Sequence, residues 1–249
     1  MGFDDPTILA LAFGRCAGWV ATVPIFGPLR PTATGRIGLA IVLSIFVAGS
    51  TSAEVTAPGV GAFVLLLSAQ VLYGLLLGWL TAVVVATFQA VGDLIDLLGG
   101  LSISAVLDPS TGTSNAVMAR FFQLIFVAAI LVSNAHLVII GGFVRSFEST
   151  GLTQLPILGE DDLFAVTRAV ADLLLSALEI GAPLVGALLL SEVTLALGAR
   201  FAPQANIFMV SLPFKAFVVF ALAGNVLIYL PLYAERISQR AAELVGAVG

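Results

Sequence analysis

Two aspartates near the end of a long apolar run have a spacing that could support chemistry. Asp93 and Asp96 are three residues apart, so on a helix they share one face. Paired carboxylates inside a membrane can relay protons or bind a cation. No third ligand stands nearby at a metal-binding spacing, and no metal site is expected. We favour the simpler interpretation, in which both side chains solvate the exposed end of a long helix.

Two other charged residues lie inside apolar segments. Arg15 falls near the middle of the first apolar run, where an arginine that faced lipid would cost about 2.5–3.5 kcal/mol. It should therefore face protein or water. We favour a structural arginine, buried against protein and paired with a carboxylate or with helix-end carbonyls, over a role in moving ions. Glu192 lies deep in a later apolar block and is a further candidate for ion coupling.

The only histidine and the only cysteine, His136 and Cys16, lie on separate segments. His136 stands close to Asn134 and is expected to be a buried hydrogen-bonding residue, because no nucleophile or acid is near it in sequence. A membrane-embedded enzyme would need a convergent set of nucleophile, base or metal ligands, which these residues do not supply. No catalytic residue and no cofactor are therefore expected.

The elements that position these residues must be membrane helices. Of the 249 residues, 59% are hydrophobic and 10% are charged, whereas soluble domains carry about 25% charge. The net charge of −5 argues against nucleic acid as a partner. The first residues lack the basic region of a cleavable signal peptide. We expect an all-α integral membrane protein surrounded by membrane lipid.

The apolar runs fit a bilayer poorly. Residues 37–49 would form a helix of about 20 Å, short of the roughly 30 Å hydrocarbon core, so a half-span packed on other protein is expected. Residues 60–98 would reach about 58 Å as one helix, so they are either two antiparallel segments or one helix that runs well beyond the membrane. Residues 121–144 form a good apolar segment of 24 residues, and Pro183 implies a kink or break. This misfit suggests an unusual, multi-subunit architecture.

One polar stretch separates two of the apolar runs. From Asp108 to Asn115 there is no large apolar side chain, and Pro109 and Gly112 oppose a continuous helix. Such a segment should lie where it meets water, either on the outside or in a water-filled lumen. Composition alone favours an ordinary surface loop.

Several short motifs occur in the order and spacing of a known family and together cover essentially the whole chain. They are Gly92-Asp93-Leu94-Ile95, Gly100-Leu101-Ser102 with Asp108-Pro109, Asn134-Ala135-His136-Leu137, the run from Arg200 to Phe208, and Pro213-Phe214-Lys215. With them the chain resembles the FliR family of flagellar export-gate subunits and its injectisome counterpart, SctT. The family often has Gln where this chain has Gly99, and Gly where it has Ala135.

The resemblance implies a fold and a set of partners. A single copy would assemble with several FliP-like and FliQ-like subunits into a conical gate, alongside FlhB-like and FlhA-like export components. Residues 1–145 would be FliP-like and residues 146–249 FliQ-like, built from long bent helical hairpins. The gate would sit in the bacterial inner membrane at the flagellar basal body, and unfolded flagellar axial proteins would pass through it.

The resemblance also assigns the polar stretch as a plug loop under the closed pore. Methionine is an adaptable apolar residue suited to a soft seal at the end of such a loop. The plug residues would be Asp108, Pro109, Ser110, Thr111, Gly112, Thr113, Ser114, Asn115, Val117 and Met118.

Other positions are expected to pack one subunit against another. Gly74 and Gly78 have the GxxxG spacing that lets another helix approach closely. Lys215 can neutralise helix C-terminal carbonyls or an acidic neighbour. The full set is Arg15, Gly74, Gly78, Pro203, Gln204, Asn206, Pro213 and Lys215.

Two alternatives remain open at this point. One is a gate subunit of an injectisome instead of a flagellum. The other is an ion or solute transporter that uses Arg15, Asp93, Asp96 or Glu192 as its coupling site, although the sequence shows no convincing inverted repeat of the kind such proteins carry.

Overall fold

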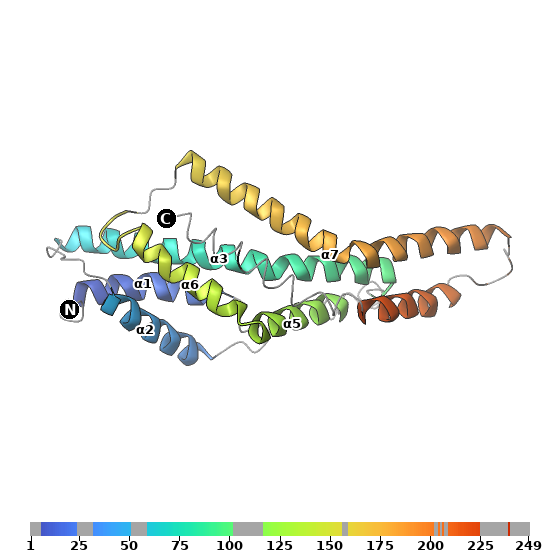
Figure 1. Ribbon diagram of the computed structural model, residues 1–249, viewed down its shortest axis with the longest axis horizontal. Coiled ribbons are helices and arrows are strands. Elements are labelled where there is room, and N and C mark those ends of the chain that lie inside the picture. The colour runs from blue at the N-terminus through green and yellow to red at the C-terminus, as the bar shows by residue number, and fades with distance from the viewer. Residues whose placement is uncertain are drawn as a thin grey trace. The chain divides into compact units, whose positions relative to one another are not determined.

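A computed structural model describes residues 6–23, 32–50, 59–101, 117–155, 159–201, 204, 206, 209–224 and 239. A further apolar helix, Met209–Gly224, is called helix 209–224 below. The described residues contain no strand, so the expected all-α class is confirmed. The labelled helices (Figure 1) are α1 (Pro6–Thr22), α2 (Ala33–Ser50), α3 (Val60–Gly99), α5 (Val117–Val132), α6 (Ala135–Ser149) and α7 (Glu160–Phe201).

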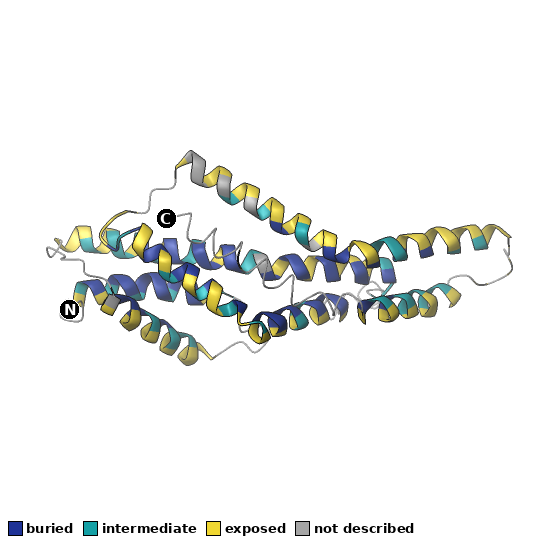
Figure 2. Cartoon of the chain, in the orientation of Figure 1, coloured by how far each residue is buried: buried dark blue, intermediate teal, exposed yellow. Residues whose placement is uncertain are grey.

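Within the described part of the chain, two helices are long and apolar enough to cross a membrane, namely α3 and the part Val166–Phe201 of α7. The bent pair of α5 and α6 would add a third if it counts as one span. Large apolar side chains are exposed along much of α7 and helix 209–224 (Figure 2), among them Leu190, Val193 and Phe217. Apolar surface of this extent has to be covered by lipid or by other protein.

The chain folds into two compact units. The first unit comprises Met1–Val84, Asn134–Ala171 and Arg236–Gly249, and the second comprises Val85–Ser133 and Asp172–Glu235. Both α3 and α7 therefore contribute to each unit. Each unit is made of stretches that alternate along the chain. The FliP-like and FliQ-like parts predicted from the sequence are instead consecutive, and their assignment stays a prediction.

In the first unit, α1 packs on the first part of α3 through a line of glycines. A Cβ atom on Gly74 would overlap the backbone carbonyl of Arg15, and one on Gly78 would overlap the Thr22 hydroxyl. The Thr22 hydroxyl in turn faces the carbonyl oxygen of Leu75, at 3.4 Å. The close approach that GxxxG predicts is therefore made by α1 of the same chain, which corrects the prediction that another subunit fills this face.

In the second unit, the last part of α3 packs on α5 around aromatic rings. Phe88 and Phe126 stack with ring centroids 3.6 Å apart, and Ile95 and Phe122 are fully buried beside them. A Cβ atom on Gly92 would overlap the backbone of Ala119, so the two helices are close enough to exclude any side chain there.

The long apolar run after residue 59 forms one helix, α3, of 40 residues. This settles the alternative in favour of a single helix, about 60 Å long. It ends at Gly99, and Gly100 has φ +71°, a left-handed conformation that glycine adopts without a steric penalty. The helix α2 begins at Ala33 and has 18 residues, so it is longer than the predicted half-span.

The apolar segment over residues 121–144 forms two helices and not one, because the chain breaks inside it. The helix α5 ends at Val132, and Asn134 has φ 57° before α6 begins at Ala135. Asparagine tolerates this left-handed conformation better than most residues, and a helix cannot continue through it. Pro183, by contrast, lies inside α7 and does not interrupt it.

Candidate functional site

The side chain of Arg15 is fully buried in the first unit and binds three acceptors. Its Nε donates to the side-chain oxygen of Gln70 at 2.7 Å. Its Nη1 and Nη2 donate to the backbone oxygens of Ser146 at 2.7 Å and Thr150 at 3.0 Å. Of the two partners predicted for Arg15, the structure shows helix-end carbonyls, because Thr150 is the C-cap of α6. A cation at this end complements the helix dipole.

Around this guanidinium, aromatic rings and a glutamine complete the cluster. Its central carbon lies 4.3 Å from the Phe147 ring centroid and 4.8 Å from that of Tyr73. The Gln70 amide donates to the carbonyl of Leu152 at 3.0 Å, which extends the contact beyond the end of α6. Arg15 thus ties α1 to α3 and to the C-terminus of α6, a structural task that occupies its donors.

Gln70 is a member of this cluster that the sequence reasoning missed. It is fully buried. A signal was present, because Gln70, Gly74 and Gly78 are spaced by four residues and so share one face of α3. A lone amide on the same face as closely packed glycines needs a partner from the opposing helix.

Asp96, in the second unit, is 1% exposed and binds the first turn of α5. Its Oδ1 accepts the backbone N–H of Met118 at 3.0 Å, and its Oδ2 accepts that of Ala119 at 2.9 Å. The prediction that both aspartates solvate a helix end is therefore wrong for Asp96, whereas Asp93 is exposed as expected. The carboxylate satisfies donors that every helix N-terminus leaves unpaired, which the local sequence around Asp96 does not reveal.

The backbone of Asp96 also takes part in the end of α3. Its carbonyl accepts the N–H of Leu101 at 3.0 Å, and the carbonyl of Leu97 accepts that of Gly100 at 3.3 Å. These two bonds, with the left-handed Gly100, are the Schellman arrangement that closes a helix C-terminus.

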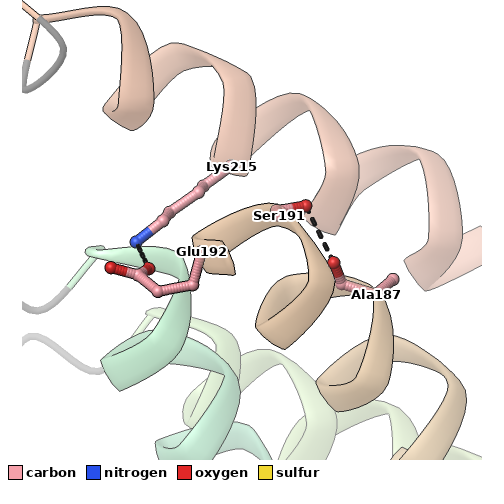
Figure 3. A network of polar contacts seen from close by, with 4 residues as sticks. All are labelled: Ala187, Ser191, Glu192 and Lys215. Atoms are coloured by element: carbon pink, nitrogen blue, oxygen red, sulfur yellow. Dashed lines mark hydrogen bonds and ion pairs between the residues drawn. The ribbon is translucent and has the colours of Figure 1, made fainter. Parts of the chain in front are cut away.

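An ion pair joins two helices of the second unit. Lys215, on helix 209–224, contacts the carboxylate of Glu192 on α7 (Figure 3). The residue before Glu192 is Ser191, and its hydroxyl donates to the Ala187 carbonyl of the same helix at 2.8 Å. The Lys215 side chain is 12% exposed and that of Glu192 58% exposed. An acidic neighbour was one of the two partners predicted for Lys215. The sequence did not identify which acid it would be.

Several predicted residues fall outside the part of the chain that the structure describes. These are Pro203 and the plug residues from Asp108 to Asn115. Val117 and Met118, also assigned to the plug, belong to the first turn of α5, where Met118 is buried. Their assignment to the plug stays a prediction.

The remaining predicted residues lie around helix 209–224. Asn206 precedes it and its side-chain oxygen accepts the Met209 N–H at 3.4 Å. Gln204 lies in the turn before it, and Pro213 is the fifth residue of the helix, where proline cannot donate to the Met209 carbonyl. No group of three potential metal ligands occurs among the described residues.

Comparison with known proteins places the chain in a family. The model of the bacterial export proteins, family 1, matches residues 7–243. The flagellar biosynthetic protein FliR of Bacillus subtilis (strain 168) is 30% identical over 212 residues, which are 84% of this chain and 82% of the relative. FliR of Pectobacterium carotovorum subsp. carotovorum is 28% identical over 236 residues, 95% of this chain and 90% of the relative.

The surface presentation of antigens protein SpaR of Shigella sonnei is 32% identical over 166 residues, 63% of this chain and 62% of the relative. The family model covers almost the whole sequence of this chain. The chain therefore belongs to the bacterial export proteins, family 1.

Proposed function

We propose that this chain is a structural subunit of a flagellar type III protein export gate in the bacterial inner membrane. The observation that carries the proposal is the family match over residues 7–243. The FliR relatives align over 84% and 95% of the chain and SpaR over 63%, which favours a flagellar system over an injectisome.

The buried charges support a structural role over ion transport. A coupling residue must bind and release its ion, so its ligands have to be free to change. The donors of Arg15 are directed at Gln70 and the end of α6, and both carboxylate oxygens of Asp96 accept backbone N–H groups. Such fixed contacts suit a scaffold. No catalytic role is assigned to any residue.

Assembly with other subunits accounts for the exposed apolar surface. Large apolar side chains on α7 and helix 209–224 face away from the buried positions of their unit. Lipid would cover part of this surface. We propose that FliP-like and FliQ-like subunits cover the rest, and that FlhB-like and FlhA-like components act with the gate at the flagellar basal body.

Within this proposal, unfolded axial proteins pass through a central pore, and the segment from Asp108 to Asn115 plugs it at rest. A closing element must be displaced by substrate, so it should be held by weak contacts. Small polar side chains with a proline and a glycine have the required composition. The proposal that this segment plugs the pore rests on its amino-acid sequence.

Co-purification tests the proposed function. The full chain, carrying an affinity tag, would be expressed with the FliP-like and FliQ-like subunits of its own system and extracted in mild detergent. A large hetero-oligomer containing one copy of this chain is expected. A monomer or a symmetric homo-oligomer, recovered while those subunits are present in the same membranes, would instead indicate a transporter. Swarming of a deletion strain complemented by the chain provides the cellular control.

A further inference from the structure

Asp96 acts at both ends of the segment of residues 102–116. On the side that precedes the segment, its carbonyl accepts the N–H of Leu101. On the side that follows, its carboxylate accepts the N–H groups of Met118 and Ala119. The two flanks of the segment, 22 residues apart between Asp96 and Met118, are therefore held at one residue.

Both bonds of the carboxylate go to the positive end of a helix. Two charge-assisted bonds and the dipole of α5 compensate for burying this carboxylate, which is 1% exposed. An amide in its place would keep one acceptor oxygen but would turn an N–H group toward another N–H group. The contact therefore depends on a carboxylate and not only on the shape of the side chain.

The body of α5 is held by different contacts. Phe88 stacks on Phe126, and Phe122 and Ile130 are fully buried. On α5, the side chains of Phe122, Phe126 and Ile130 lie about one to three turns beyond the capped end. The apolar attachment of α5 therefore extends well beyond the first turn, where the carboxylate of Asp96 and the close approach of Gly92 to Ala119 both act.

We propose that Asp96 is the anchor that holds together the two described flanks of residues 102–116. With the carboxylate in place, the end of α3 and the first turn of α5 stay together. Without it, the first turn of α5 loosens while the apolar contact between α3 and α5 persists. The anchor rests on the geometry around Asp96 and does not depend on the proposed function.

Distances between spin labels test the anchor in the purified complex that contains the full chain. The reporting pair is Leu97 and Val117, exposed positions on the last turn of α3 and the first turn of α5. The reference pair is Gln89 and Leu124, exposed positions on the bodies of the same helices. The buried Cys16 is replaced by alanine so that only the introduced cysteines react.

In the parent protein both pairs should give a single narrow distance. The Asp96→Ala variant should lose the narrow distance of the reporting pair and keep that of the reference pair. Asp96→Asn should be intermediate. Asp93→Ala removes an exposed carboxylate one turn earlier and should change neither pair.

Two results would overturn the proposal. An unchanged reporting pair in Asp96→Ala would mean that the cap is not what holds the flanks. Loss of both narrow distances, or of the folded complex in both Asp96 variants, would mean that Asp96 is part of the core and not a separable anchor. Neither readout requires export, so failure of the gate assignment would leave this result interpretable.

Discussion

Each of the two units stabilises the end of a helix with a buried charged side chain. The two side chains have opposite charges and join different numbers of segments. In the first unit, the cation of Arg15 meets the C-terminus of α6. In the second unit, the anion of Asp96 meets the N-terminus of α5. Both follow from the helix dipole, whose ends attract opposite charges.

The difference lies in the length of the side chain. Arginine is long and has five donors, so Arg15 can join three segments, α1, α3 and the end of α6, from one position. Aspartate is short, so its backbone must come close to the helix that it caps. That approach is available because Gly92 has no side chain opposite Ala119. Arg15 therefore connects elements, whereas Asp96 fixes one junction between two of them.

A third charged contact is weaker than either. Glu192 is 58% exposed, so its pairing with Lys215 is more open to its surroundings than the two buried charges. Partly exposed ion pairs contribute about 0–1 kcal/mol. Leaving a buried acceptor without its donor costs about 1–3 kcal/mol for each acceptor. This order predicts which substitution should damage the protein most.

Replacing Arg15 with leucine should have the largest effect. It leaves the buried Ser146 carbonyl and the Gln70 side-chain oxygen without this donor, at about 1–3 kcal/mol for each acceptor. The yield of assembled complex, measured by size-exclusion chromatography, should fall more than the conductance of the complexes that do assemble. Arg145→Leu removes an exposed arginine on α6 and serves as the matched control. Normal yield from Arg15→Leu would contradict the structural role.

Adding one methyl group at Gly74 should be next in effect. In Gly74→Ala the new Cβ would overlap the Arg15 carbonyl, so α1 must move away from α3 and carry Arg15 with it. We expect lower thermal stability of the detergent-purified protein. Gly61→Ala lies on the same helix with nothing within 4 Å of the added atom and should be neutral or slightly stabilising. Equal thermal stability of the two variants would show that the contact between α1 and α3 tolerates separation of the helices.

Reversing the charge of Lys215 should have a smaller effect on assembly. Lys215→Glu places two carboxylates together at the contact between α7 and helix 209–224, and it should reduce both assembly and export. The double variant Lys215→Glu with Glu192→Lys restores opposite charges and should recover most of the yield. If the double variant is no better than the single one, the pair does not account for the role of Lys215.

Shortening the proposed plug should affect assembly least. Removing Ser110–Ser114 deletes no apolar side chain and leaves Leu101, Met118 and Ala119 to bind Asp96. The gate should assemble fully, but resting membranes should become leaky to ions and small solutes, measured as conductance without substrate. Replacing the five residues by a Gly/Ser stretch of equal length should keep the membrane tight. A shortened gate that assembles and stays tight would return the segment to an ordinary surface loop.

Much of the fold could be predicted because it depends on composition and local pattern. An apolar chain with few charges has to form helices in a membrane, and the long run without proline before Gly99-Gly100 is helical, although only the structure decided that it is one helix and not two. The energetic cost of a charge at bilayer depth also required Arg15 to be buried against protein, and this is confirmed. In each case the reason acts within a few residues or on one side chain.

The partners of the buried groups were decided only by the tertiary structure. Burial cost shows that Arg15 needs acceptors, but acceptors 131 and 135 residues away become visible only when α6 is placed. The fate of Asp96 was misjudged for the same reason, since an aspartate near a helix end is normally solvated and only the approach of α5 made it a cap. The break at Asn134 likewise needed the fold, because asparagine permits a left-handed residue without requiring one. Local sequence determines what a residue costs when it is buried, and the packing of distant segments determines what compensates for that cost.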